Sequence, residues 1–222
     1  MKLYKFRPLG TEKDLNRIDE ILSTNNFWGS KFFELNDPME GVFYFPLDIN
    51  EKMMHLTRLL FSAKNSYKIC SFSNVYGFEN PLLWGHYANG FKGVAIEIDV
   101  NPSEVYQVRY ANSILDIKLS GQDADDIVKE ILTTKLILWN YENEYRLLRK
   151  NEESKQQLGR TTKVYFGNPY GNLYNTHEIQ PEAIKNYLDL REKLLEKINK
   201  YNIDSSLVKV NGTKVIVDNR DY

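Results

Sequence analysis

The order of strand-like and helix-like stretches places the strongest constraint on the fold of this chain. Alternating apolar and polar residues indicate strands at residues 3–7, 27–30, 67–73, 92–99, 105–110 and 162–166, and in a hairpin around Asn211-Gly212. Apolar residues at helical spacing indicate helices at residues 11–24, 49–63, 80–89 and 123–136, and a long helix from Pro181. Strands and helices in this mixed order predict an α+β fold with a mixed sheet and flanking helices, rather than a repeating βαβ unit.

Residue types at the ends of these stretches support several boundaries. Thr11 and Asp14 have the spacing of a helix-capping pair, and Asn25 follows the apolar stripe that they begin. Residues 36–38 read Asn-Asp-Pro, and this combination favours a turn because the short polar side chains bond to nearby backbone and proline fixes its own φ. The polar run 151–160 is predicted to be a loop.

The length of the chain fits one domain with a substantial core. We expect residues 1–222 to form a single domain, in which residues 179–222 add a helical and hairpin extension at the C-terminal end. The formal net charge is -1, from 29 basic and 30 acidic residues. The charge of the whole chain therefore does not point to nucleic acid or to an anionic membrane as a partner.

Cysteine and histidine content disfavours a metal site. Cys70 is the only cysteine, which excludes an internal disulfide and a cysteine-rich metal site and fits a reducing cytoplasm. His55, His86 and His177 lie far apart and lack metal-ligand spacing. Residues 1–7 lack the apolar core of a signal peptide, and no run approaches the roughly 20 apolar residues of a membrane span. We expect a cytoplasmic protein without membrane contact.

Residues 139–148 combine strand character with an unusual concentration of charge. Read as a strand, they place Glu142, Glu144 and Arg146 on one face. Like charges on one face of a sheet repel each other, so this pattern is locally unfavourable unless the carboxylates have a function. The alternative is that Arg146 and a neighbouring lysine neutralise two solvated carboxylates on an exposed face.

Three polar motifs, in this order, resemble the mono-ADP-ribosyltransferase pattern of arginine, serine and glutamate strands. Tyr4-Lys5-Phe6-Arg7 corresponds to the arginine strand, Ser71-Phe72-Ser73 to the Ser-Thr-Ser element and Glu142-Asn143-Glu144 to the acidic strand. The sequence departs from the pattern at Phe72, where threonine is usual. The resemblance implies an ADP-ribosyltransferase-like split architecture with NAD as cofactor and substrate.

A second resemblance covers residues 3–150. The stretches Leu3–Arg7, Leu35–Glu40, Ser71–Ser73, Asn80–Ala88, Lys92–Asp99 and Tyr141–Arg146 are similar to a widespread bacterial family of unassigned function, often found in phage-defence settings. Tyr145 stands where tryptophan is usual in that family. This resemblance implies a bacterial context, and the ADP-ribosyltransferase comparison supplies the chemistry.

The two resemblances together imply a role for each site residue. Glu144 would stabilise the positive charge that develops on ribose when nicotinamide leaves, and Glu142 would orient or deprotonate an acceptor. Arg7 would grip the pyrophosphate, while Ser71 or Ser73 would orient Glu144 or the ribose. The other residues expected on the NAD-binding side are Tyr4, His86 and Tyr87. For His86 and Tyr87 a structural role is the alternative, as a hydrogen-bonded histidine and a core aromatic residue.

The predicted function is an NAD-dependent mono-ADP-ribosyltransferase that modifies a protein or a nucleic acid, as a bacterial toxin or phage-defence effector with an antitoxin or regulatory protein as partner. A non-catalytic module that binds a nucleotide or a partner is the first alternative. The second is a nuclease, in which Asp37, Glu40, Glu97 and Asp99 gather around magnesium.

Overall fold

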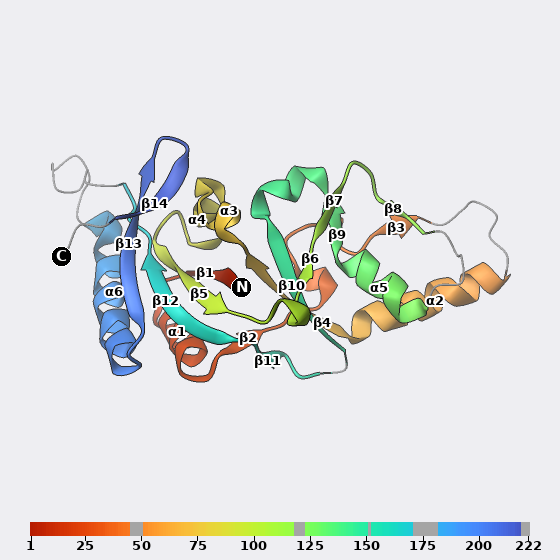
Figure 1. The fold of residues 1–222 in the computed structure, drawn as a ribbon, viewed down its shortest axis with the longest axis horizontal. Helices are drawn as coiled ribbons and strands as arrows, with labels where there is room; N and C mark the ends of the chain where they lie inside the picture. The colour runs from red at the N-terminus through yellow and green to blue at the C-terminus, as the bar shows by residue number, and fades with distance from the viewer. Residues whose placement is uncertain (45–50, 118–122, 151, 171–181, 219–222) are drawn as a thin grey trace. The chain divides into compact units, whose positions relative to one another are not determined.

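The computed structural model describes residues 1–44, 51–117, 123–150, 152–170 and 182–218 (Figure 1). The chain separates into two compact units. Unit 1 comprises Met1–Asn26, Phe72–Asn101 and Gln157–Tyr222, and unit 2 comprises Phe27–Ser71 and Pro102–Gln156. Helices and strands alternate in mixed order, so the predicted α+β class is confirmed.

Unit 1 is built on a mixed sheet with the strand order β14-β13-β12-β5-β1. The strands are β1 (Lys2–Pro8), β5 (Gly93–Asp99), β12 (Arg160–Phe166), β13 (Asp204–Asn211) and β14 (Lys214–Asp218). Strand β5 pairs antiparallel with both β1 and β12, whereas β12 and β13 run parallel. The last residue of β4 (Tyr67–Ser73) pairs with β1 through Ser73 and Tyr4. The predicted hairpin at Asn211-Gly212 is confirmed, and through β13 it belongs to the main sheet of this unit.

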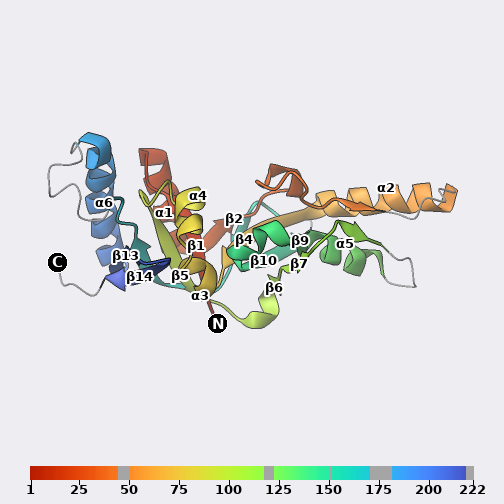
Figure 2. The same cartoon turned by 90° about the horizontal axis from the view of Figure 1, so that it is seen from above.

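Helices cover both faces of the unit 1 sheet (Figure 2). They are α1 (Glu12–Thr24), α3 (Val75–Phe78), α4 (Pro81–Tyr87) and α6 (Glu182–Lys200). Side chains alternate along β1, and Tyr4 and Phe6 on one face contact Phe78 of α3 and Trp84 of α4, with ring centroids 4.5 and 5.3 Å apart. Helix α1 packs on β1 and on α6.

The local signals at α1 predicted its ends correctly. Thr11 is the N-cap residue and accepts a hydrogen bond from the backbone N–H of Asp14 at 3.2 Å. Asn25 ends the helix in the left-handed conformation with φ 54°, which asparagine adopts more readily than most residues. Pro181, predicted to begin the long helix, lies outside the described residues, and α6 is described from Glu182.

Unit 2 contains several short strand pairs. The larger sheet has the order β4-β10-β6, with β10 at Glu144–Lys150 and β6 at Tyr106–Gln107. The two-stranded pairs are β2 (Asn26–Trp28) with β11 (Lys155–Gln157), β3 (Phe43–Tyr44) with β8 (Leu115–Asp116), and β7 (Arg109–Ala111) with β9 (Thr134–Leu136). The strand predicted at 105–110 is therefore divided between β6 and β7, and the loop predicted at 151–160 includes β11.

The helices of unit 2 enclose an apolar core with the strands. They are α2 (Glu51–Ser66) and α5 (Ala124–Leu132), with 3-10 helices η1 (Phe32–Glu34), η2 (Pro102–Glu104) and η3 (Ile137–Glu142). The buried core residues are Leu60, Tyr67, Ile69, Ile117, Ile127, Val128, Ile131, Leu132 and Leu148. The helix predicted to run to Leu136 ends at Leu132, because the chain then enters β9.

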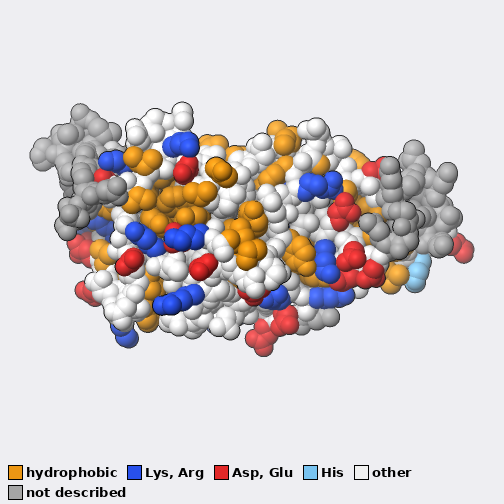
Figure 3. Space-filling view, viewed as in Figure 1, with side chains coloured by type: hydrophobic (Ala, Val, Ile, Leu, Met, Phe, Trp, Pro, Cys, Tyr) orange, Lys and Arg blue, Asp and Glu red, His pale blue; other side chains and the backbone are white. Residues whose placement is uncertain are grey.

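The surface carries no dominant charge on the face that Figure 3 presents, where basic and acidic side chains are interspersed. This distribution agrees with the formal net charge of -1. Among the described residues, no helix is both long enough and apolar enough to cross a membrane.

Candidate functional site

The stretch 139–148 is not a single strand, contrary to the prediction. Residues Ile137–Glu142 form the 3-10 helix η3, Asn143 adopts a left-handed conformation with φ 45°, and β10 begins only at Glu144. The left-handed residue breaks the alternation that an extended chain would have. Strand alternation therefore accounts for the shared face of Glu144 and Arg146, and Glu142 reaches the same place from a helical turn.

A buried lysine joins the two glutamates of this stretch. The Nζ atom of Lys135, on β9, lies 2.6 Å from Oε2 of Glu142 and 3.2 Å from Oε2 of Glu144. The ring of Trp139 lies next to the same ammonium group, with 4.7 Å between Nζ and the ring centroid. Such a contact favours the charged form of the lysine. Glu142 and Glu144 are thus brought together by their ion pairs with Lys135, and not by lying on one face of a strand.

Arg146 completes a group of charges that we call the glutamate cluster, consisting of Glu40, Lys135, Glu142, Glu144 and Arg146. The guanidinium donates to both oxygens of Glu40 and to both oxygens of Glu144, at 2.6 to 3.1 Å. It also donates to the carbonyl oxygen of Leu132 at 2.6 Å. Forked ion pairs of this kind are the strongest that arginine forms with carboxylates.

The glutamate cluster is buried, and opposite charges keep its members ionised. The side chains of Glu144 and Arg146 are 5% and 1% exposed. Burial alone would raise the pKa of Glu144, but the charges of Arg146 and Lys135 and hydrogen bonds from Arg146 and Ser71 lower it below its ordinary value. Burial would likewise lower the pKa of Lys135, and the charges of Glu144 and Glu142 raise it. Arg146 and a lysine do pair with Glu142 and Glu144, as the alternative interpretation of the sequence expected. The pairs are buried, however, and do not lie on an exposed face.

The two predicted serines lie in different units. Ser71, in unit 2, hydrogen-bonds to Glu144, which is one of the orienting roles expected for it. Ser73, in unit 1, is 4% exposed and pairs with Tyr4 across the β1–β4 ladder. In addition, the backbone N–H of Glu144 donates to the hydroxyl of Tyr110 at 2.9 Å. Glu144 is thus held at both its backbone and its side chain.

Three of the residues predicted to bind NAD line one pocket of unit 1. This arginine pocket has a volume of about 390 Å³ and is lined by Lys5, Phe6, Arg7, Pro8, His86, Tyr87 and Asn89. Its titratable side chains are basic or aromatic, and none of the seven lining residues is acidic. An anionic ligand group is therefore the chemistry that the lining favours.

Local sequence signals position the arginine pocket. Asn80 caps α4, Pro81 occupies its first turn, and the helix ends so that His86 and Tyr87 lie in its last turn. Asn89 then has φ 50°, which turns the chain back toward β5. Gly93 begins β5 so close to β1 that an added Cβ would stand 2.3 Å from the carbonyl oxygen of Arg7. Glycine at this position keeps β5 tight against the strand that carries Arg7.

Tyr4 lies in the core rather than in the arginine pocket. Its ring stacks on Phe78 with 4.5 Å between centroids, and its hydroxyl donates to Glu97 at 3.2 Å. Thr162 and Tyr165 also donate to Glu97, at 2.8 and 3.0 Å. Burial would raise the pKa of Glu97, and hydrogen bonds from Lys2, Thr162 and Tyr165 lower it.

The carboxylates considered for a nuclease are divided between the two units. Asp37 and Glu40 belong to unit 2, whereas Glu97 and Asp99 belong to unit 1. Asp37 builds the predicted turn, since its side chain accepts from the backbone N–H of Met39 at 2.9 Å. Glu40 is bound by Arg146. In the part of the chain that the structure describes, no three histidine, cysteine, aspartate or glutamate side chains are arranged to hold a metal ion.

Sequence reasoning missed a second buried lysine next to the glutamate cluster. The ammonium of Lys64 lies 4.4, 4.9 and 4.5 Å from the ring centroids of Phe32, Phe43 and Phe61 and donates to the carbonyl oxygen of Gly41 at 2.6 Å. Burial lowers the pKa of Lys64 to about 8, although the charge of Glu40 opposes this shift. Lys64 is thus an anchor for the turn that carries Glu40. One sequence signal could have indicated this burial: Lys64 follows Leu56 and Leu60 at intervals of four residues, and so continues the apolar side of the helix.

Comparison of the chain with protein-family models, with curated proteins and with solved structures found no match.

Proposed function

We propose that the protein is an NAD-dependent mono-ADP-ribosyltransferase with the split architecture of that class, modifying a protein or a nucleic acid. The observation that carries the proposal is the Glu144 carboxylate, which is kept ionised in a buried site and is oriented by Ser71. Breaking the bond between nicotinamide and ribose develops positive charge on the sugar, and an ionised carboxylate stabilises such charge. Glu142 is assigned the orientation or deprotonation of the acceptor.

The arginine pocket of unit 1 supports NAD as the ligand. Arg7 and Lys5 supply positive charge for charge-assisted hydrogen bonds to a pyrophosphate, and His86 adds a further donor. Tyr87 offers an aromatic face to a planar ring. In the proposal the enzyme acts in the bacterial cytoplasm as a toxin or phage-defence effector, held in check by an antitoxin or regulatory protein. This context rests on the sequence resemblance alone.

The position of Lys135 sets a condition on this activity. Its ammonium lies between Glu142 and Glu144, where a positively charged sugar or acceptor group would be stabilised. Because the Glu144 side chain is only 5% exposed, the proposed reaction requires a movement that opens this carboxylate to the substrate, and we assign that movement to Lys135. We therefore assign the described arrangement to a closed form of the enzyme.

The proposal is tested by incubating the purified protein with NAD and a bacterial extract and measuring released nicotinamide by chromatography. Glu144→Gln should lower the release by about a hundredfold or more, as expected for loss of a transition-state charge partner. Glu104→Gln is the matched control, since Glu104 is a half-exposed member of an ion pair with Arg149 in the same unit. Circular dichroism checks that each variant is folded. Full release by a folded Glu144→Gln variant would show that Glu144 is not the catalytic carboxylate.

NAD binding is tested separately through unit 1. NAD should raise the melting temperature of the protein, and Arg7→Gln should reduce this rise, whereas Arg17→Gln, on an exposed position of α1, should not. Absence of a melting-temperature rise together with absence of nicotinamide release would contradict the proposal as a whole.

A non-catalytic binding module is the second candidate, and the burial of the glutamate cluster favours it. Charges that satisfy one another inside a unit are a sufficient explanation for Glu144 and Arg146 as structural residues. The arginine pocket would then be the functional site. Saturable binding of NAD or another nucleotide that is lost in Arg7→Gln, without nicotinamide release under any condition tested, would support this candidate.

A further inference from the structure

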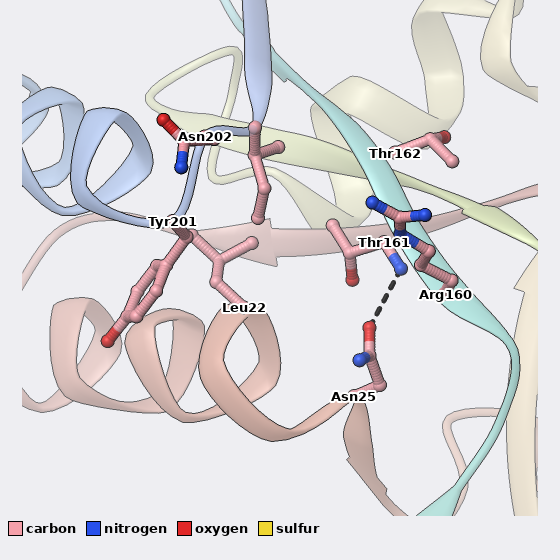
Figure 4. Close-up of a pocket in the computed structure, with 8 residues that line it drawn as sticks. Leu22, Asn25, Arg160, Thr161, Thr162, Tyr201 and Asn202 are labelled. Carbon is pink, nitrogen blue, oxygen red and sulfur yellow. Dashed lines mark hydrogen bonds between the residues drawn. The ribbon is translucent and has the colours of Figure 1, made fainter.

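A second pocket of unit 1 shares no residue with the arginine pocket or with the glutamate cluster. This helix-end pocket has a volume of about 360 Å³ and lies where α1 and α6 end beside β12 (Figure 4). Its lining residues are Leu22, Asn25, Arg160, Thr161, Thr162, Tyr201, Asn202 and Ile203. The volume falls within the range of about 300–1,000 Å³ that is usual for sites of small molecules.

Arg160 supplies the charge of the helix-end pocket. It lies directly opposite Asp99 in the β5–β12 register, where an ion pair is expected, but Asp99 contacts the amino group of Met1 at 3.3 Å. Within the described residues, the side chain of Arg160 forms no ion pair or hydrogen bond. None of the eight lining residues is acidic. The pocket therefore presents a guanidinium that is in contact with no carboxylate of the described residues.

Two asparagine amides add hydrogen-bonding groups to this charge. The side-chain oxygen of Asn25 accepts from the backbone N–H of Thr161 at 2.7 Å, the bond dashed in Figure 4. This bond fixes the orientation of the amide and leaves its NH₂ group as the end available to a ligand. Asn202 lies on the opposite side of the pocket in Figure 4, with a left-handed backbone at φ 53° and an exposed side chain.

The hydroxyl of Thr161 is a buried polar group without a hydrogen-bond partner among the described residues. Thr161 is 5% exposed. Figure 4 shows the hydroxyl directed toward the end of α1, on the side where Asn25 lies. Burying a hydroxyl without a partner is unfavourable, and a ligand atom that bonds to it would remove that cost. The observation is independent of the charge on Arg160.

The ends of α1 and α6 would disfavour an anion if their last carbonyl groups were free, because the C-terminal end of a helix carries partial negative charge. Several of these carbonyl groups are already bonded. The oxygen of Ile21 accepts from the N–H of Asn25, and the oxygen of Ile198 accepts from the N–H groups of Tyr201 and Ile203. On α1, the carboxylate of Asp19 accepts from Lys197 and from the hydroxyl of the lining residue Tyr201, at 2.8 and 2.9 Å. Arg160 is thus the one charged side chain among the eight residues that line the pocket.

We propose that the helix-end pocket binds a small organic anion, with its carboxylate or phosphate group on Arg160 and its remaining polar atoms on the amides of Asn25 and Asn202. Leu22 and Ile203 supply an apolar wall for the carbon skeleton of the ligand. The site goes beyond the proposed transferase activity, since it requires neither NAD nor the glutamate cluster.

The proposal is tested by recording ¹H–¹⁵N spectra of the full chain during separate titrations with inorganic phosphate, AMP and succinate. At least one probe should shift the backbone amide signals of Thr161, Thr162 and Asn202 in a saturable way. Shifts with phosphate and AMP but not with succinate would identify a phosphate group as the recognised anion, and the reverse result would identify a carboxylate.

Variants show whether these shifts report the helix-end pocket. Arg160→Gln should weaken binding about tenfold or more, as expected for loss of a charge-assisted hydrogen bond. Asn202→Gly, which keeps the left-handed backbone without strain, should weaken it less. Arg17→Gln removes the same charge from an exposed position of α1 and should leave binding unchanged.

Shifts that persist in Arg7→Gln exclude the arginine pocket as their source, so this site and the NAD site are judged independently. Unchanged affinity in Arg160→Gln, or no saturable shift with any of the three probes, would overturn the proposal.

Discussion

Glu40 and Arg146 are 106 residues apart in the sequence and form a forked ion pair inside unit 2, with distances of 2.6 and 2.9 Å between nitrogen and oxygen. The other donors of the same guanidinium bind Glu144 and the carbonyl oxygen of Leu132. All five N–H groups that an arginine side chain carries are therefore used. One side chain ties the Asp37–Gly41 turn, strand β10 and the end of α5 together.

Replacing Arg146 by methionine should lower the free energy of unfolding by about 3–5 kcal/mol, because two buried carboxylates lose their partner. Arg146→Lys should also be strongly destabilising, since an ammonium group has three donors and cannot form both forks. Urea unfolding followed by circular dichroism measures both changes. Arg149→Met is the control, because its ion pair with Glu104 is partly exposed and spans 3.5 Å, and its loss should cost about 1 kcal/mol or less. Equal effects at residues 146 and 149 would contradict this account of the cluster.

The features that the sequence predicted correctly are encoded by neighbouring residues. Helix α1 follows from Thr11, Asp14 and Asn25, and the C-terminal hairpin follows from Asn211-Gly212, because caps and tight turns depend on a few adjacent side chains. The sequence also indicated three of the residues that line the arginine pocket, Arg7, His86 and Tyr87. Arg7 was assigned to the site from its strand, and the cap of α4 placed His86 and Tyr87 in one helical turn.

The glutamate cluster was foreseeable only in part, because its contacts join residues distant in sequence. The alternation of Glu144 and Arg146 was predicted, but a left-handed Asn143 interrupts the strand before Glu142. Lys135 was assigned to a helix that in fact ends at Leu132, and the following strand β9 directs its side chain to the glutamates. No local signal indicates either the end of that helix or the partner of Glu40. Such pairings arise from tertiary packing, which overrides local preference.

Lys135→Met should destabilise the protein in a way that depends on pH. Without the ammonium, the proximity of Glu142 and Glu144 should raise the pKa of one of them above its value in the unfolded chain. The folded variant then binds more protons than the unfolded chain, so its stability falls as the pH rises from 5 to 7. Denaturant unfolding at the two pH values measures the difference. Lys129→Met, at a surface lysine paired with Asp125 and Asp126, should show a small loss without this trend.

The ammonium of Lys64 should lose its proton with a midpoint near pH 8, which the ¹³Cε chemical shift of the lysine reports. Because this pKa is lowered from 10.5, the unfolded chain binds more protons than the folded protein between pH 8 and 10.5. The unfolding free energy of the wild type should therefore rise relative to that of Lys64→Met over this range. Lys64→Met lacks the titrating ammonium group but keeps the other titrating groups of the wild type. The difference between the two unfolding free energies therefore reports on Lys64. A midpoint near 10.5 would show that the three phenylalanine rings and Glu40 compensate fully for burial.

Two glycines close to the arginine pocket should respond in opposite ways to alanine. In Gly93→Ala the new Cβ would meet the backbone oxygens of Arg7 and Ala88 at 2.3 and 2.8 Å, so β5 must move away from β1. We expect a loss of stability of about 1–3 kcal/mol and weaker NAD binding, since Arg7 shifts with its strand. In Gly85→Ala, within α4, the Cβ meets nothing within 4 Å, and the better helix propensity of alanine should stabilise the protein by about 0.5–1 kcal/mol. Urea unfolding measures both changes, and a neutral Gly93→Ala would mean that the contact between β5 and β1 does not position Arg7.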